Sequence, residues 1–528
     1  MSGPQDDKPS KEHGPGSDDL VGRSLSAWHE KGLGAESLGD GGGEREHYET
    51  APEDRISFVL KLVYGIGAFV NNTLAAAMGE MIKVLNLAMG IDPAVVGWIG
   101  ALPRLVDAIT DPLMGYISDH TRSRWGRRRP YIFGGAIVVG ILYIALWMFP
   151  LGQSDTFYFV WFLVGSILFY LAYTVFATPW VALGYELTPD YHERTRLMGV
   201  QNFVGQLAYV VSPWFMWFTT LEWFRDQVQG AATLAVVVGV AVMFLGVLPA
   251  IFLRERFVQP VEVAPPIVKP ELVETRGGLG ETIKDFLSGL QITISSKPFL
   301  LLAAATFLVF NGFILIGAFQ YYVIVYYIFD GDQALGAEYA GYSGTLGAIS
   351  TFIVIPIVTW LATVVGKRRA FFFAIGISIV GYALKWFCYT PDNPMLMLLP
   401  APLMAFGLGG LFTLMGSMIA DVVDVDELKT NERREGMFGS IFWWVVKLGM
   451  AVAIAGGGYL LNFTGFDVEL GGAQSEQTIT WMRACDAFIP AAASALAILA
   501  MWAYPITEQT AHEVRAELER RRAGGEAS

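Results

Sequence analysis

The sequence predicts an all-α membrane protein in which twelve helices cross the bilayer as two groups of six. Of 528 residues, 53% are hydrophobic and only 16% are charged, a balance unlike that of soluble enzymes. Apolar runs of 18 or more residues recur between Ile56 and Tyr504, and each is long enough to cross about 30 Å of hydrocarbon. Arginine and lysine gather in alternate loops between these runs, as they do in multi-pass membrane proteins.

Apolar windows place the spans at residues 56–86, 93–118, 130–150, 158–186, 197–221, 231–253, 298–328, 338–364, 369–389, 395–420, 437–463 and 480–504. A long linker separates six spans from six, and a polar tail flanks each group. The resulting parts are an N-terminal tail (1–55), an N-terminal bundle (56–253), the linker (254–297), a C-terminal bundle (298–504) and a C-terminal tail (505–528).

The tails and the linker are expected to be cytoplasmic. Residues 1–55 are polar and glycine-rich without an apolar signal segment, which predicts disorder. The linker carries apolar residues at helical spacing between Ile283 and Ile294. They predict either an amphipathic helix in the membrane interface or a surface helix packed on the bundle. Residues Glu508–Arg522 predict a short charged helix.

The positions of the basic residues predict how the protein is oriented across the membrane. They occupy the loops after spans 2, 4, 8 and 10, for example Arg122–Arg129 and Lys367–Arg369, whereas opposite loops such as Asp330–Glu338 contain none. Loops rich in arginine and lysine stay in the cytoplasm. With an even number of spans, we expect both termini to be cytoplasmic in a protein of the cell (inner) membrane.

The two halves carry similar motifs at equivalent positions. Gly126–Arg129 (GRRR) after span 2 has a counterpart in Gly366–Arg369 (GKRR) after span 8. Two six-span repeats with a binding site between them near the midplane are an architecture of secondary transporters.

Charged residues inside span 2 indicate where such a site lies. Arg104, Asp107 and Asp111 follow one another at three- and four-residue spacing, which places them on one helical face. A carboxylate at the centre of a span costs about 2.5–3.5 kcal/mol, so such residues are rarely kept without a function. We interpret the acids as a cation-coupling site; a purely structural Arg–Asp pair is the alternative.

The sequence argues against an enzyme and against nucleic-acid binding. It has no nucleophile–base pairing, metal-ligand cluster or phosphate-binding glycine loop, and Cys388 and Cys485 build neither a disulfide framework nor a metal set. The net charge of −13 reflects acids in tails and loops, and no basic, aromatic-interleaved patch is present. The expected partners are a small solute and the bilayer, with no cofactor beyond the coupling ion, for a monomeric protein.

Several motifs resemble one transporter family. Arg104–Pro112 (RLVDAITDP) and Ser118–Pro130 (SDHTRSRWGRRRP) resemble the glycoside–pentoside–hexuronide:cation symporters, the melibiose-permease branch of the major facilitator superfamily. Leu187–Thr195, Asp421–Gly436 and Lys61–Phe69 resemble other segments of that family. The resemblance covers residues 56–504 and implies the major facilitator fold with cation-coupled symport.

The resemblance also implies a cation site. The family's coupling acids fall on Asp107 and Asp111, its intervening polar residue on Thr110, and its helix-4 threonine on Thr174. These oxygen ligands suit Na⁺, the only metal ion expected, and a proton is the other candidate.

An intramembrane lysine of the family falls on Lys447, which would be a counter-ion to the acids or a solute donor. Lys447 lies in the middle of its span. Lys61 and Lys385 lie near span ends, where a lysine is expected to snorkel to the interface.

The family's sugar site is altered. Its sugar-binding acids on helices 1 and 4 fall on Asn72 and Ala177, and its arginine on helix 5 falls on Asn202, so binding of a galactoside in that manner is not expected. The predicted solute contacts are Asn72, Asn202, Lys447, Trp444 and Arg104. Helix–helix hydrogen bonding and core packing remain alternative roles for the uncharged ones.

Two charged groups near the ends of spans have further interpretations. Glu80 and Lys83 either pair with each other or belong to an outward gate or second proton site. Asp119, Arg127 and Arg128 resemble the superfamily's signature loop, which ties helices together on the cytoplasmic face; a role in topology alone is the alternative.

Together these features predict a secondary active transporter that couples Na⁺ or H⁺ to a small polar solute, expected to be a glycoside or other sugar, by alternating access. One alternative is transport of an amphiphilic or lipid-like solute on the same scaffold. The other is a membrane sensor that transports nothing.

Overall fold

Long helices form the protein in the computed structural model, which describes residues 52–188, 190–255, 293, 295–430 and 434–525. Ten helical segments in this part of the chain are long and apolar enough to cross a membrane. Two more helices, α4 and α7, have 28 and 21 residues but carry more polar side chains. Together they make the predicted twelve, and the described ranges contain no strand.

The first half comprises α2 (Phe58–Met81), α3 (Lys83–Leu87), α4 (Pro93–His120), α5 (Arg129–Trp147), α6 (Asp155–Glu186), α7 (Tyr191–Val211), α8 (Trp214–Thr219), α9 (Gln227–Gly246) and α10 (Leu248–Phe252). The second half comprises α12 (Lys297–Val323), the π-helical turn η2 (Ile324–Ile328), α13 (Gln333–Val365), α14 (Lys367–Cys388), the 3₁₀ turn η3 (Pro394–Leu398), α15 (Pro400–Thr430), α16 (Glu435–Phe463), η4 (Val468–Leu470) and α17 (Glu476–Trp502). The helix α18 (Glu508–Gly525) follows, where a charged helix was predicted.

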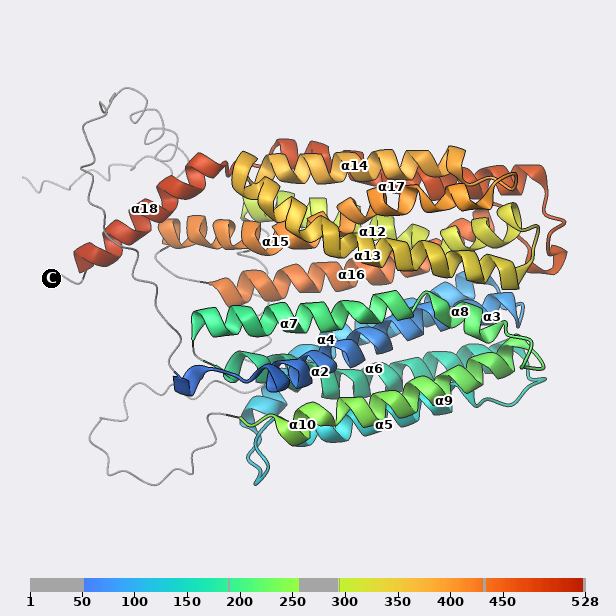
Figure 1. Cartoon of the computed structure of the whole chain (residues 1–528), viewed down its shortest axis with the longest axis horizontal. Coiled ribbons are helices and arrows are strands. Elements are labelled where there is room, and N and C mark those ends of the chain that lie inside the picture. The colour runs from blue at the N-terminus through green and yellow to red at the C-terminus, as the bar shows by residue number, and fades with distance from the viewer. Residues whose placement is uncertain (1–51, 189, 256–292, 294, 431–433, 526–528) are drawn as a thin grey trace, which may run out of the picture. The chain divides into compact units, whose positions relative to one another are not determined.

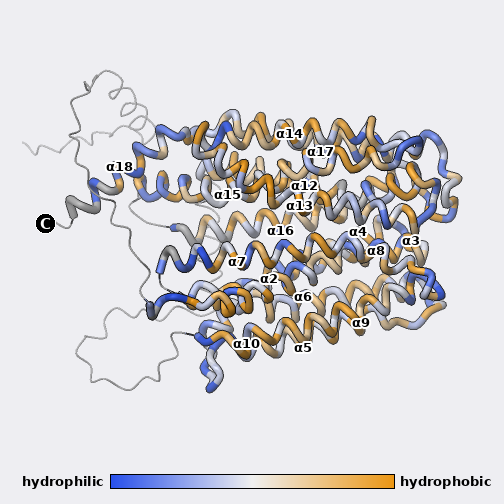
Figure 2. Tube along the Cα trace, viewed as in Figure 1, coloured by the Kyte–Doolittle hydropathy of each residue, from blue (hydrophilic) through white to orange (hydrophobic). Residues whose placement is uncertain are grey.

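Polar residues cap the starts of these helices, and apolar residues make up most of their length. Asp92, Ser154 and Asp226 each accept a hydrogen bond from the first turn of the helix that follows, which satisfies backbone donors that lack intrahelical partners. Figure 2 shows hydrophobic residues along the middle of the bundle and hydrophilic residues at both ends of it. This pattern is expected when the helices cross a hydrocarbon layer.

The spans predicted at 56–86, 197–221 and 231–253 are interrupted in the structure. Pro213 separates α7 from α8, since proline lacks the amide donor that would continue the helix. Short breaks at Ile82 and Val247 divide the other two. The predicted linker helix and the N-terminal tail up to residue 51 lie outside the described residues.

The two ends of the bundle differ, and we name them by their residues. The basic end holds the α4–α5 loop, the start of α14 and α18; the closed end holds α3, α8 and η2. Side chains from the two halves share one buried core at the closed end, where Leu85 and Ile91 belong with Tyr322, Tyr326 and Phe466.

Hydrogen bonds also join the halves at the closed end. The Tyr322 hydroxyl donates to the buried Asn86 Oδ1 over 2.8 Å. Hydrogen bonds of 2.8–3.0 Å also join three further residue pairs: Trp98 donates to Tyr459, Asn462 to both carboxylate oxygens of Asp92, and Trp214 to Thr345.

The basic loops repeat in the structure as in the sequence. Gly126 and Gly366 both have positive φ, at 109° and 84°, which glycine adopts without steric cost. A carboxylate lies over each of them, from Glu255 and Glu508 respectively, where a Cβ atom would collide with it. The duplication predicted from GRRR and GKRR therefore extends to the groups that surround each loop.

Candidate cation and solute site

Helix α4 carries the three charged residues on one face, as predicted. Asp107 is only 1% exposed, whereas the Asp111 side chain, one turn nearer the basic end, is 35% exposed. An ion that reaches the pair from solvent would therefore meet Asp111 first.

Helix α6 supplies hydroxyl groups to both carboxylates. The Thr174 hydroxyl donates to Asp107 Oδ1 over 2.8 Å, and the Thr178 hydroxyl donates to Asp111 Oδ1 over 3.2 Å. Thr110 lies 3.4 Å from Thr174, oxygen to oxygen. The four residues predicted for the cation site are thus adjacent, and Thr178 joins them.

Lys447 reaches the same acids from α16, in the opposite half. Its ammonium nitrogen lies 3.1 Å from Asp107 Oδ2 and donates to Asp111 Oδ2. Its side chain is 26% exposed. The lysine therefore joins the two halves through the proposed cation site.

The donor set suits a small hard cation. It consists of carboxylate and hydroxyl oxygens, which bind Na⁺-like ions better than soft metals. Among the described residues, no group of three or more His, Cys, Asp or Glu side chains could hold a transition metal. The groups in direct contact, two carboxylates and one ammonium, carry a formal charge of −1, and the guanidinium of Arg104 lies one helical turn away.

Arg104 lies one turn from Asp107 on the closed-end side. Its guanidinium carbon is 4.4 Å from the centre of the Tyr170 ring, a distance typical of a cation–π contact. Within the described residues the guanidinium has no ion pair or hydrogen bond. Its five donors remain available to an oxygen-rich solute.

The other predicted solute contacts are more dispersed. Asn72 donates to the Gly205 carbonyl of α7 over 3.0 Å and accepts a hydrogen bond from Asn71. Asn202 is exposed on α7, and Trp444 is partly buried on α16, three residues before Lys447. The bond to Gly205 gives Asn72 at least a packing role, and contact of these three with a solute stays a prediction.

The signature-loop residues form an ion-pair network at the basic end. Arg128 pairs with Asp119 at 2.7 Å and with Glu186 at 2.9 Å, and Arg127 also pairs with Glu186. The Glu255 carboxylate accepts backbone hydrogen bonds from residues 127, 128 and 129. The network ties the end of α4 to α5, α6 and the segment after α10.

The prediction that Lys61 and Lys385 snorkel to the membrane interface is wrong, because both form ion pairs. Lys61 pairs with the buried Glu193 at 2.7 Å. Lys385 pairs with Asp486 of α17 at 2.6 Å, and each of the two side chains is 2% exposed. Position near a span end suggested an interfacial lysine, but a carboxylate on a neighbouring helix gives each ammonium a partner inside the bundle.

Glu80 and Lys83 pair with each other at 2.7 Å, which was one of the two predicted possibilities. The Lys83 ammonium also lies 5.3 Å from the centre of the Tyr321 ring, across the closed end. The pair thus contacts both halves at the position expected for a gate.

Comparisons with known proteins agree on a class. Residues 63–508 match the model of a family described as MFS/sugar transport protein. The isoprimeverose transporter of Lactiplantibacillus pentosus is 25% identical over 82% of this chain and 85% of its own. The sodium-dependent lysophosphatidylcholine symporter 1 of Mus musculus is 23% identical over 87% of this chain and 88% of its own. A crystal structure of a D-xylose-proton symporter superposes with a TM-score of 0.61 at 14% identity, covering 85% of this chain and 98% of that one, which supports the fold.

Proposed function

Since the chain belongs to the MFS/sugar transport protein family, and is a symporter of that family as its motifs predicted, we propose that Asp107 and Asp111 bind the cation that drives it. The cation exchanges with Lys447 at these acids. A solute then binds in the centre of the bundle, and the two halves rock to alternate access.

The contact of Lys447 with both acids is the observation that carries this proposal. An ammonium between two carboxylates occupies the position that Na⁺ or a proton would take. Unlike charges about 4 Å apart attract by roughly 4 kcal/mol at the effective dielectric of a protein surface, so an arriving cation competes with Lys447 for the same oxygens. Displacement would free the ammonium for the solute, and this exchange couples the two binding events.

The arrangement of the halves supports entry of the ion from one side. The halves are joined at the closed end by a shared core and hydrogen bonds, and the more exposed acid, Asp111, is nearer the basic end. We assign the basic end to the cytoplasm on the positive-inside pattern, with both termini there. The conformation is then inward-facing, and each positive charge carried inward gains about 2.3 kcal/mol per 100 mV.

A glycoside or other sugar is the proposed solute class. The isoprimeverose transporter is a relative over most of the chain. Arg104 and Lys447 provide donors for hydroxyl or carboxylate oxygens. Asn72 and Ala177 replace charged sugar-binding positions, so neutral or anionic sugars bound by the cationic groups fit better than a galactoside held by acids.

A lipid-like solute is the second candidate. The lysophosphatidylcholine symporters are also relatives over most of the chain. On α4, Ile109, Leu113 and Ile117 are 72%, 38% and 39% exposed at four-residue spacing, which forms an apolar strip on the face of the helix opposite the acids.

Uptake into proteoliposomes tests the cation site and separates the two solute classes. Labelled isoprimeverose, a glucuronide and lysophosphatidylcholine are offered under an inward Na⁺ gradient and, separately, a proton gradient. We expect one solute to accumulate with the wild type, and accumulation to be lost in Asp107→Asn and Asp111→Asn.

Asp226→Asn is the matched control. Asparagine caps a helix as well as aspartate does, so α9 keeps its N-terminus and uptake should persist. Gradient-driven uptake at the wild-type level in both site variants would overturn the proposal.

A further inference from the structure

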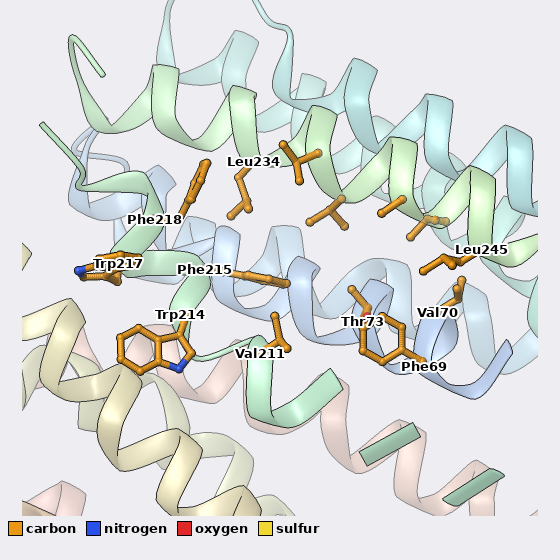
Figure 3. Close-up of a pocket in the computed structure, with 14 residues that line it drawn as sticks. Phe69, Val70, Thr73, Val211, Trp214, Phe215, Trp217, Phe218, Leu234 and Leu245 are labelled. Atoms are coloured by element: carbon orange, nitrogen blue, oxygen red, sulfur yellow. The ribbon is translucent and has the colours of Figure 1, made fainter. Parts of the chain in front are cut away.

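A cavity lies away from the acids, inside the first half of the protein. Residues of α2, the end of α7, α8 and α9 enclose a volume of about 320 Å³ (Figure 3). No residue of α4 or α6 lines it, so it is separate from the site around Asp107.

The lining of this cavity is almost entirely hydrocarbon. Phe69, Val70, Phe215 and Leu234 point into it. The polar side-chain groups among the lining residues are the hydroxyl of Thr73 and the indole N–H groups of Trp214 and Trp217. That hydroxyl is buried without a hydrogen-bond partner in the described residues. A sugar here would leave most of its hydroxyl groups unpaired, which costs free energy for each of them.

Water is an equally poor occupant. The volume is roughly ten times the ~30 Å³ that one water molecule takes up in the liquid, yet a buried water needs two to four polar partners. One hydroxyl group and the indole N–H of Trp217 cannot supply them, because the N–H of Trp214 already donates to Thr345.

The walls of the cavity are held in place by contacts with neighbouring helices. On α8, Trp214 Nε1 donates to Thr345 Oγ1 over 2.8 Å, and the Trp214 ring packs edge-on against Tyr342 at 5.2 Å, both on α13. Gly230 at the start of α9 lies so close to Thr219 that a Cβ atom would be 2.5 Å from its carbonyl oxygen. These contacts hold α8 against α13 and against the start of α9.

The rim of the cavity faces the hydrocarbon of the membrane. Val211 on α7 and Val237 on α9 both line the cavity, and they are 47% and 54% exposed. α9 belongs to one of the candidate membrane spans, so the medium outside these positions is acyl chains.

From these observations we infer that the cavity binds one acyl chain of a bilayer lipid. The chain enters between Val211 and Val237 and packs against Phe69, Val70 and Phe215, where it replaces contacts that an empty cavity would lose. Because α8 is one wall and also holds α13 through Trp214, the bound chain stabilises the joined closed end. The inference does not depend on the cation site or on the identity of the solute.

Photolabelling tests the occupant. The wild type is reconstituted in phosphatidylethanolamine–phosphatidylglycerol vesicles that contain a phosphatidylcholine with a diazirine in the middle of one acyl chain. We expect labelled peptides to be concentrated in Phe69–Thr73, Trp214–Phe218 and Leu234–Leu245. A lipid with the diazirine on its headgroup should not label these segments.

Two valines of α9 provide a matched pair. Val237→Trp fills the rim and should abolish labelling of the cavity segments. Val240 is 50% exposed on the same helix but does not line the cavity, so Val240→Trp should leave the labelling unchanged.

Absence of acyl-probe labelling from the cavity segments of the wild type would overturn the inference, and so would either of two further results. One is wild-type labelling of the cavity in Val237→Trp. The other is loss of labelling when excess lysophosphatidylcholine is added, which would assign the cavity to a transported amphiphile instead. The comparison of acyl and headgroup probes uses the wild type alone and decides the matter even if Val237→Trp does not fold.

Discussion

Replacing Lys447 with methionine should make the protein bind its coupling cation more tightly. The ammonium lies 3.1 Å from Asp107 Oδ2 and also donates to Asp111, so it competes with any ion for those oxygens. Methionine keeps most of the length of the side chain and removes the competitor.

The size of the effect follows from the contact that is lost. A hydrogen bond to a charged group contributes about 1.5–3 kcal/mol net. The Lys447 side chain is 26% exposed and that of Asp111 is 35% exposed, so solvent screening argues against a larger figure. At 1.4 kcal/mol per tenfold, Lys447→Met should tighten cation binding about 10- to 100-fold.

Equilibrium binding of ²²Na⁺ to purified protein, repeated at several pH values to register a competing proton, measures this affinity. Lys61→Met is the control, because Lys61 pairs with Glu193 away from the acids and its loss should leave the affinity unchanged. An unchanged or weaker affinity in Lys447→Met would refute the competition, and would make the lysine a support of the ion site instead.

Three further outcomes follow from single contacts. Thr178→Val removes the hydroxyl that donates to Asp111 over 3.2 Å. The loss of about 0.5–1.5 kcal/mol should weaken cation binding roughly 2- to 10-fold in the ²²Na⁺ binding assay. Unchanged affinity would exclude Thr178 from the site. Lys385→Met leaves the buried Asp486 unpaired and should destabilise the protein by about 3–5 kcal/mol. Replacing both residues with methionine should restore most of the unfolding midpoint measured in detergent. A double variant as unstable as the single one would contradict this. Tyr322→Phe removes the 2.8 Å bond to Asn86 and should increase, by up to about tenfold, the fraction of molecules in which the two halves separate at this end. Electron–electron distance measurements between spin labels on the two halves would detect the change. An unchanged distance distribution would count against a gate there.

The helices could be predicted well from the sequence, because a helix that crosses the membrane must itself carry a long run of apolar residues. All twelve apolar windows coincide with helices, and most bounds agree within a few residues. The interruptions were harder, although the proline at position 213 does carry a local signal for the break between α7 and α8. The end of α15 could not be placed by apolarity, since the helix continues to Thr430 through acidic residues.

Part of the site could also be predicted. Asp107 and Asp111 follow from helical spacing together with the cost of burying charge, and Thr174 from the family resemblance. Thr178 was missed, yet its four-residue spacing from Thr174 matches the spacing of the two acids, so that each acid faces one threonine.

Pairings between distant helices could not be predicted from local pattern. Lys385 and Asp486 are 101 residues apart, and only the packing of α14 against α17 brings them together. The same limit explains why Lys447 could be assigned as a counter-ion only through the resemblance, since α4 and α16 meet across the two halves.

Cation stoichiometry tests the central claim most directly. Purified wild-type protein is titrated with Na⁺ by calorimetry while released or absorbed protons are recorded in weakly buffered solution, and the titration is repeated on Asp107→Asn. We predict one cation, Na⁺ or H⁺, bound per chain in the wild type and none in the variant. One cation bound with equal affinity by both proteins would contradict a coupling site built on α4.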